Sequence, residues 1–159
     1  MNRKIILPVM FVVFLIADQV SKIAVQTNMK LSESITVIPG FFNITYVLNP
    51  GAAFGIFGNM PDLFRKVFFV GITLAACVFI LYLLYKEFNY KLRSFAYIAI
   101  VAGAIGNLID RIRLSQVVDF LDFHIGNFHW YTFNLADCYI TVGVAVLILD
   151  MFINKNKAA

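Results

Sequence analysis

The sequence predicts an all-α membrane protein with four transmembrane helices and a small β-rich cradle on one side of the membrane. Of its 159 residues, 61% are hydrophobic and only 14% are charged, whereas about 25% are charged in an ordinary soluble chain. The apolar residues gather in four runs separated by more polar segments. A soluble fold of this size could not bury so much apolar surface, so the expected solvent is lipid.

The first predicted helix covers about residues 5–25. Arg3 and Lys4 precede its apolar run, as they would in a signal peptide, but no small-residue cleavage site follows. The pattern instead continues past Lys22 and gives about 20 residues, which is enough for a roughly 30 Å hydrocarbon core. We therefore expect a retained helix.

The other three predicted spans cover about residues 67–85, 95–110 and 135–153. Backbone polar groups in lipid must find partners within their own segment, so each span is expected to be a helix. The second span is almost free of polar side chains, whereas the third and fourth carry polar groups at one end. Together the four spans predict a single integral membrane domain over residues 1–159.

Two segments outside the spans have a different character. Residues 34–38 and 41–47 are β-branched and aromatic, and Pro39 and Gly40 separate them. This pattern predicts two short strands with a turn, which form the cradle between the first two helices. Residues 115–133 are aromatic-rich and suit a non-helical connection at the membrane–water interface.

The basic residues predict the orientation of the chain. Because positive charge favours the cytoplasmic side, the denser basic set on the shorter segments is expected there, which puts both termini in the cytoplasm. The segments that cover about residues 26–66 and 111–134 are then extracytoplasmic. The net charge of +4 forms no stripe, so no nucleic-acid partner is expected. The cytoplasmic set is Arg3, Lys4, Lys86, Lys91, Arg93, Lys155 and Lys157.

This orientation brings polar residues from distant segments to the outer ends of the helices. Within each helix they are three or four positions apart and therefore share a face. Ionisable side chains in a membrane usually face protein or water, and they are functional candidates by default. The converging residues are Asp18, Lys22, Asn49, Asn107, Asp110, Arg111, Asp119, Asn134 and Asp137.

Asp119 and Asp137 are the candidates for catalysis. Two carboxylates within a few ångströms of each other do not both ionise easily, so one keeps its proton. Such a pair can activate water with the charged member and protonate a carbonyl oxygen with the neutral one. The sequence shows no metal-binding motif, so neither a metal nor another cofactor is expected. His124 and His129 lack metal-ligand spacing and are interpreted as loop residues.

Other interpretations stay open at this point. Asp18–Lys22 and Asp110–Arg111 are equally consistent with structural ion pairs, and Asp150 is interpreted as a lone interfacial charge. A transporter or proton relay could use intramembrane carboxylates, but a relay should place them at successive depths. A non-enzymatic scaffold would not need charges clustered at one depth.

Five short motifs follow one another along the chain. Residues 18–22 read DQVSK, 49–54 NPGAAF, 106–111 GNLIDR, 117–120 VVDF and 133–137 FNLAD. They resemble the D-x-x-[ST]-K, N-x-G-A-A-F, G-N-x-x-D-R, V-V-D-F and F-N-x-A-D motifs of lipoprotein signal peptidases, also called signal peptidase II. Each motif is weak alone, but five in order with four spans make a specific resemblance. Cys138 is a departure, because relatives often have Ser there.

The resemblance implies an intramembrane aspartyl endopeptidase of the bacterial plasma (inner) membrane. Such an enzyme removes signal peptides from diacylglyceryl-modified prolipoproteins, just before the lipidated cysteine, at a site near the extracytoplasmic surface. It also implies membrane lipids as partners and inhibition by globomycin-type cyclic peptides. Asp119 and Asp137 match the catalytic pair, whereas Asp122 matches no catalytic position and is expected to tolerate Asn. The supporting positions are Asn49, Gly51, Asn107, Asp110, Arg111, Asn134, Ala136, Asp18 and Lys22.

Overall fold

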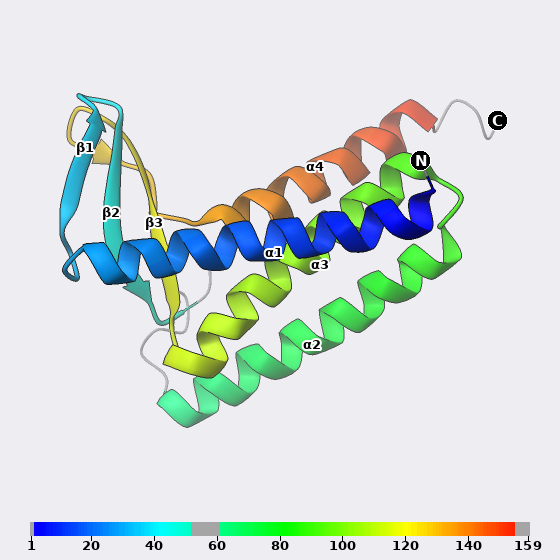
Figure 1. Ribbon diagram of the computed structural model, residues 1–159, viewed down its shortest axis with the longest axis horizontal. Coiled ribbons are helices and arrows are strands. Elements are labelled where there is room, and N and C mark those ends of the chain that lie inside the picture. The colour runs from blue at the N-terminus through cyan, green and yellow to red at the C-terminus, as the bar shows by residue number, and fades with distance from the viewer. Residues whose placement is uncertain (1, 52–60, 155–159) are drawn as a thin grey trace.

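Four long helices form the body of the protein. The structure is a computed structural model, and it describes residues 2–51 and 61–154. The helices are α1 (Arg3–Asn28), α2 (Asp62–Lys86), α3 (Lys91–Leu114) and α4 (Leu135–Asn154). All four are long and apolar enough to cross a membrane, as the sequence predicts. The start of α1 and the end of α4 lie at the same end of the bundle, opposite the sheet (Figure 1).

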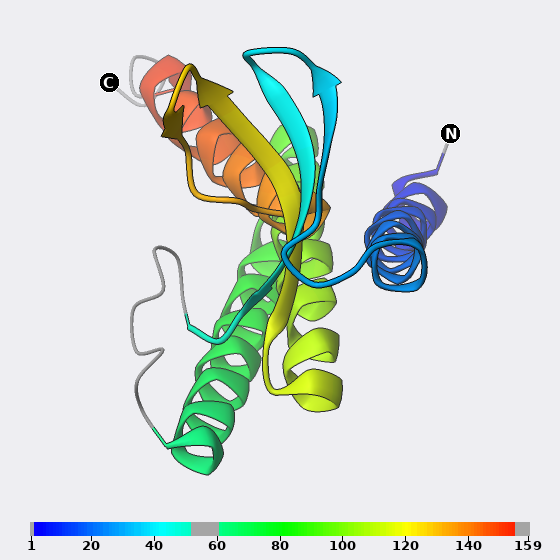
Figure 2. The ribbon, with the colours of Figure 1, turned by 90° about the vertical axis from the view of Figure 1, so that its left-hand side faces the viewer.

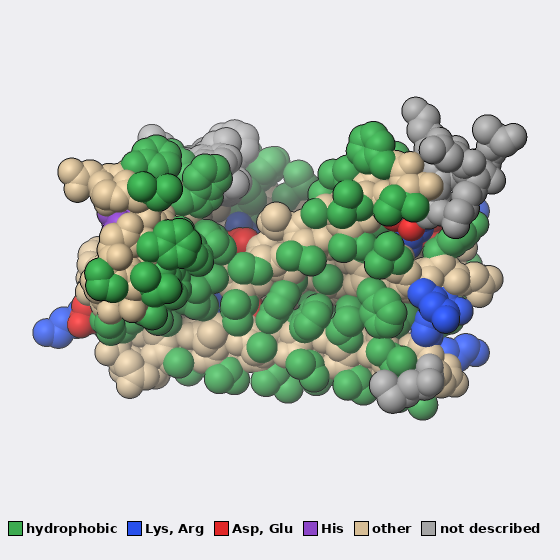
Figure 3. Space-filling model, turned by 90° about the horizontal axis from the view of Figure 1, so that it is seen from above, with side chains coloured by type: hydrophobic (Ala, Val, Ile, Leu, Met, Phe, Trp, Pro, Cys, Tyr) green, Lys and Arg blue, Asp and Glu red, His purple; other side chains and the backbone are tan. Residues whose placement is uncertain are grey.

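The helical body is apolar on the outside and polar at selected places inside. Helix α3 packs against the other three helices and is mostly buried, whereas α1, α2 and α4 turn most of their apolar residues outward. Val12, Phe79 and Leu149, for example, are exposed, and hydrophobic side chains extend along the length of the body (Figure 3). Because lipid solvates such surfaces and helices satisfy their own backbone, this is the arrangement of a helical membrane protein.

Small residues allow α3 and α4 to approach closely. A Cβ added at Gly103 would lie 2.3 Å from the carbonyl oxygen of Ala136, and one at Gly143 would lie 2.8 Å from that of Ala96. Close approach through small residues is how helices associate where lipid surrounds them. A Cβ at Gly106 would lie 2.5 Å from Oδ2 of Asp18, so this glycine leaves space for a buried carboxylate.

An antiparallel sheet lies at one end of the bundle (Figures 1 and 2). Its strand order is β1 (Ser34–Ile38), β2 (Phe42–Asn49), β3 (Val117–Ile125) and β4 (Phe128–His129). The two strands predicted after the first helix are confirmed. The cradle is not confined to the chain between the first two helices, however, because β3 and β4 come from the connection between α3 and α4.

Residues His124 and His129 are therefore strand residues and not loop residues, and they face each other in the β3–β4 pairing. The interpretation of both as loop residues was wrong. Acidic residues are rare in strands, and β3 carries two of them in nine residues. Pairing with β2 outweighs this poor local preference.

A bulge in β2 directs its side chains to both faces of the sheet. Between the pairs Ile44–Leu121 and Val47–Asp119, β2 has two residues where β3 has only Phe120. An extra residue changes which later side chains share a face with the partner strand. Asn43 thus pairs with Asp122 on one face, whereas Asn49 reaches Asp119 on the other.

A small core joins the sheet to the helices. Val25 of α1, Tyr46 of β2, and Val118 and Phe120 of β3 are buried against one another. Val118 is completely buried. Because Asp119 lies between Val118 and Phe120, this packing holds the backbone that carries its carboxylate.

Polar contacts join the helices at the end opposite the sheet. Asp150 of α4 pairs with Arg93 of α3, and Arg93 also pairs with Glu87 at 3.0 Å. The Tyr97 hydroxyl donates to Glu87 at 2.7 Å. Asp150 is buried, with 7% of its surface exposed. The interpretation of Asp150 as a lone interfacial charge was therefore wrong, because only the packing of α3 against α4 brings Arg93 within reach.

Candidate active site

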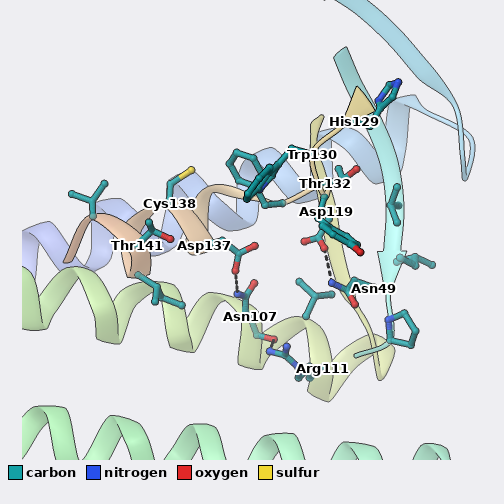
Figure 4. Close-up of a pocket in the computed structure, with 18 residues that line it drawn as sticks. Asn49, Asn107, Arg111, Asp119, His129, Trp130, Thr132, Asp137, Cys138 and Thr141 are labelled. Atoms are coloured by element: carbon teal, nitrogen blue, oxygen red, sulfur yellow. Dashed lines mark hydrogen bonds between the residues drawn. The ribbon is translucent and has the colours of Figure 1, made fainter. Parts of the chain in front are cut away.

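Asp119 and Asp137 face one cavity from two different elements. Asp119 lies on β3, and Asp137 lies in the first turn of α4. Figure 4 shows both carboxylates directed into the same space, with Asn107 below Asp137 and Asn49 beside Asp119. The cavity has a volume of about 990 Å³. Its other walls come from the end of β2, from residues 129–133 and from the face of α4 that carries Cys138 and Thr141.

Asp119 is held by two side-chain amides. Asn134 donates to Oδ1 at 2.6 Å, and Asn49 donates to Oδ2 at 2.9 Å. Only 2% of the Asp119 surface is exposed. Burial, together with the nearby charge of Asp137, raises the pKa of Asp119 to about 7, although the two amides and Lys22 oppose the shift. A carboxyl with such a pKa exchanges its proton in the neutral range.

Asp137 is held by the start of its own helix. Its Oδ2 accepts the backbone N–H of Asn134 at 3.2 Å, and Asn134 Oδ1 in return accepts the backbone N–H of Asp137 at 3.1 Å. This reciprocal pair resembles a capping box and begins α4 at a defined residue. The other oxygen of Asp137 accepts from Asn107 Nδ2 at 2.8 Å. Both ends of this carboxylate are thus fixed relative to the cavity.

Two asparagines connect the carboxylates. Asn134 Nδ2 donates to Asp119 and also to Asn107 Oδ1, the latter at 3.1 Å. Because Asn107 Oδ1 accepts there, its Nδ2 is the group that donates to Asp137. The network therefore directs one side-chain amide donor to each catalytic candidate from the buried side.

A buried cluster of charged side chains around Lys22 contacts this network through Asn107. The ammonium of Lys22 lies 3.0 Å from Asp18 and 3.0 Å from Asp110, and it donates to Asn107 Oδ1 at 2.9 Å. All three charged side chains are at most 1% exposed. Such a group is tolerated in a low-dielectric site only because its members satisfy one another.

The same cluster fixes the elements that carry the carboxylates. Asp18 Oδ1 accepts the backbone N–H of Ala136 at 2.9 Å, which places a negative charge at the N-terminus of α4. Asp110 Oδ2 accepts the backbone N–H of Val118 at 3.2 Å, next to Asp119 in β3. The cluster thus positions α4 and β3 relative to α1 and α3.

Comparison with known proteins agrees with this site. The family model described as Signal peptidase (SPase) II matches residues 10–153. The chain belongs to the signal peptidase II family. A lipoprotein signal peptidase of Syntrophus aciditrophicus is 50% identical over 144 residues, 90% of this chain and 89% of the relative. That of Desulforapulum autotrophicum is 47% identical, over 87% and 86% of the two chains.

The fold is also similar to that of a solved structure. A solved bacterial membrane enzyme is 35% identical and superimposes with a TM-score of 0.87, over 96% of this chain and 91% of that one. The chain is thus a protease of the signal peptidase II family and a multi-pass membrane protein. The transporter and scaffold interpretations do not fit this family.

In this signal peptidase the predicted site residues lie together. The structure brings Asn49, Gly51, Asn107, Arg111, Asp119, Asn134 and Asp137 to the cavity or its immediate support, with Asp18, Lys22, Asp110 and Ala136 behind them. Residues 52–54 of the second motif lie outside the described residues. The catalytic and supporting roles of the residues at the cavity stay predictions.

The ion pairs differ from those considered from spacing alone. Lys22 bridges Asp18 and Asp110, so the Asp18–Lys22 pair is present. Arg111 instead directs its guanidinium to the carbonyl oxygens of Asn107 and Gly51, both at 3.4 Å. Adjacent positions on a helix point in different directions, so Asp110 and Arg111 reach different partners.

Sequence reasoning did not find the part of the cavity wall formed by residues 129–133. The expectation that Asp122 tolerates Asn stays a prediction, and the surroundings of this carboxylate argue against it. Asp122 is 5% exposed, and Thr45, Asn43 and His129 all contact it. The available signal was a polar residue inside a run of β-branched and aromatic residues, which predicts a buried, partnered group when the run is a strand.

Proposed function

We propose that this signal peptidase is an aspartyl endopeptidase whose catalytic residues are Asp119 and Asp137. Its substrate is a prolipoprotein that carries diacylglycerol on a cysteine, and it cleaves the peptide bond just before that cysteine. The observation that carries the proposal is the pair itself: two carboxylates from separate elements face one cavity, and each receives neutral amide donors.

The proposed reaction needs only the two carboxyl groups and a water molecule. The ionised carboxylate removes a proton from the water molecule as the water oxygen attacks the scissile carbonyl carbon. The neutral carboxyl donates its proton to the carbonyl oxygen. The tetrahedral intermediate then breaks its C–N bond: the carboxyl that took the proton from water gives it to the leaving nitrogen, and the other carboxylate takes a proton back from a hydroxyl of the intermediate, which becomes the new carboxyl group. The pKa of about 7 supports Asp119 as the member that keeps its proton.

The remaining predicted residues have supporting roles in this proposal. Asn49, Asn107 and Asn134 orient the carboxylates, and Lys22 with Asp18 and Asp110 holds the elements that carry them. Arg111 lines the cavity, and its guanidinium donates to the Gly51 carbonyl oxygen at 3.4 Å. The apolar surface around the cavity suits a lipidated substrate that arrives from the membrane. From the same similarity to the family, we expect membrane lipids to surround the protein and globomycin-type cyclic peptides to inhibit the enzyme.

The proposed location is the bacterial plasma membrane, with the cavity on the extracytoplasmic side. The distribution of basic residues supports this orientation. Four apolar helices support membrane insertion. The cavity lies between the sheet and the adjacent ends of α3 and α4, away from the Arg93 end of the bundle.

Cleavage of a defined substrate tests the proposal. Purified protein in detergent should cleave a diacylglyceryl-modified prolipoprotein and leave the unmodified precursor intact. Asp119→Asn and Asp137→Asn should each lower kcat by orders of magnitude, and the double variant should be little worse, because groups that act as a unit are strongly non-additive. Near-normal cleavage by either folded single variant would show that the pair is not catalytic.

A further inference from the structure

A second buried carboxylate lies three residues beyond Asp119 on the same strand. Asp122 is 5% exposed, and its Oδ2 accepts from the Thr45 hydroxyl at 2.9 Å. Asn43 Nδ2 lies 3.5 Å from the same oxygen. Both partners belong to β2. The bulge in β2 makes this possible, because it places Asn43 and Thr45 on the face opposite Asn49.

The other oxygen of Asp122 joins the sheet to the cavity wall. Asp122 Oδ1 lies 2.8 Å from His129 Nδ1, and the His129 ring stacks on His124 with centroids 4.6 Å apart. His129 lines the cavity, as do the next four residues, 130–133. Asp122 is thus a junction between the β1–β2 hairpin and this part of the wall.

Backbone hydrogen bonds attach the wall to β3 at two points. Strand β4 contains only two residues. Beyond it, Trp130 donates its backbone N–H to Phe123 at 2.8 Å, and Phe133 donates to Leu121 at 3.1 Å. Between these two points the chain leaves the sheet to border the cavity. The side-chain contact of His129 with Asp122 is therefore a further attachment at the start of this segment, directly before Trp130 and Tyr131.

The charge of Asp122 strengthens the junction. Burial alone would raise the pKa of Asp122, but the contacts from His129, Thr45 and Asn43 outweigh it and bring the pKa below its ordinary value. The carboxylate is thus ionised at neutral pH, and hydrogen bonds to an ionised acceptor are stronger than those between neutral groups.

We propose that Asp122 is a positioning residue for substrate binding, which holds the wall formed by residues 129–133 in place through His129. It does not act on the scissile bond, because it lies on the opposite face of β3 from Asp119. The proposal rests on the function proposed above and adds to it a residue that controls substrate affinity. Its expected signature is a change in KM with little change in kcat, because uniform binding and not transition-state stabilisation is lost.

The chain provides its own reporter for this wall, since Trp130 is its single tryptophan. We would compare wild type with Asp122→Asn and His129→Phe. The phenylalanine keeps a ring that stacks on His124 but removes the nitrogen that meets Asp122. Ser34→Ala is the matched control, because Ser34 bonds the Thr45 hydroxyl at 2.8 Å and does not itself contact Asp122, so the contacts of Asp122 with Thr45 and His129 stay available.

In Asp122→Asn and His129→Phe, we expect the fluorescence anisotropy of Trp130 to fall. We also expect KM for the lipidated precursor to rise about tenfold while kcat stays within about twofold, which is the pattern for lost uniform binding. Ser34→Ala should match wild type in all three quantities. The double variant should be no worse than the worse single variant, since both remove one contact.

Two outcomes would overturn the inference: folded His129→Phe with wild-type KM and anisotropy, or a loss confined to kcat. Because His129 is half exposed at its side chain, this variant should fold even if Asp122→Asn does not. Failure of the proposed function would look different. Wild type would then not cleave the precursor. The variants would instead be compared with wild type by titrating the Trp130 fluorescence with the precursor, and equal binding midpoints would refute the positioning role.

Discussion

Asp119 occupies a position where a negative charge is costly. It is buried beside a second carboxylate, and its direct partners are neutral amides. Asp137, in contrast, accepts a backbone N–H at the start of a helix, where the helix dipole favours negative charge. Two chemically identical side chains thus have different surroundings, which is the condition for one acid and one base in a pair.

This difference predicts how stability depends on pH. The pKa of Asp119 is raised to about 7 in the folded protein, above its ordinary value of about 4. Its contribution to the free energy of unfolding is therefore fully present below about pH 4, and it is lost as the pH rises through about 7. Asp119→Asn avoids this cost. Its Tm relative to wild type, measured by thermal unfolding in detergent, should therefore increase from pH 5 to pH 8. Glu33→Gln, an exposed carboxyl-to-amide change, should show no such trend.

Arg111 gives a second prediction at the level of one side chain. Its two terminal nitrogens reach the carbonyl oxygens of Asn107 and Gly51, and its Cζ lies 5.0 Å from the centre of the Phe69 ring. A lysine cannot reproduce a planar group with several directed donors. We expect Arg111→Lys to lower kcat/KM for the lipidated precursor by at least about tenfold, a loss of roughly 1.4 kcal/mol.

Arg113→Lys is the control, since Arg113 is exposed two residues further along the same helix end. It should cleave like wild type. Undiminished cleavage by well-folded Arg111→Lys would mean that Arg111 serves membrane topology alone.

At the scale of elements, close contact between helices decides where the carboxylates lie. Helix α4 approaches α3 through Gly103 and Gly143, and its N-terminus is fixed to α1 through Asp18. The distance between Asp119 and Asp137 therefore depends on contacts made by residues that never reach the cavity. A change in these contacts should affect the site without altering any residue that faces the substrate.

Gly106→Ala tests this relation. Its new Cβ would lie 2.5 Å from Oδ2 of Asp18, so Asp18 would have to move away from Lys22 or from the N–H of Ala136. Overpacking of this kind typically costs about 1–3 kcal/mol. We expect a lower Tm and reduced kcat.

Gly71→Ala is the matched control on α2, because nothing lies within 4 Å of the Cβ it would add. It should leave both Tm and kcat unchanged. Wild-type cleavage by Gly106→Ala would show that the contact among α1, α3 and α4 does not determine the geometry of the site.

At the scale of the whole molecule, charge is distributed between two ends. The sheet end holds the Lys22 cluster and the two aspartates of the cavity, and the opposite end holds the Arg93 cluster with Glu87 and Asp150. Between these ends the described parts of the four helices carry no acidic side chain. A proton relay would require acids at successive depths, so this distribution favours one reaction site near one surface.

The orientation of the molecule remains a prediction and can be measured with reporter fusions. Fusions between Lys86 and Lys91 should report a cytoplasmic position, and a fusion at Gly126, in the turn between β3 and β4, should report an extracytoplasmic one. The reason is the excess of basic residues near the first position. A cytoplasmic signal at Gly126 would reverse the orientation and place the cavity on the opposite surface.

The four helices and the identity of the candidate pair could be predicted from the sequence. An apolar run of sufficient length must form a helix in lipid, because only local hydrogen bonds satisfy its backbone there. Motifs in order along the chain were enough to select Asp119 and Asp137. The strand β3 could not be predicted in this way, since its acidic residues disfavour a strand until β2 pairs with it.

Spacing along the chain determined which residues share a helix face, but the tertiary structure alone decided their partners. Lys22 meets Asp110 and Asn107, 85 residues away in the latter case, while Arg111 turns from its neighbour Asp110 towards backbone carbonyls. Asp150 finds Arg93, and Asp122 finds His129 across a sheet. Helix periodicity is a local property of the backbone. The partner of a buried charge depends instead on how helices approach and where a strand bulges, and these features arise only when the elements pack.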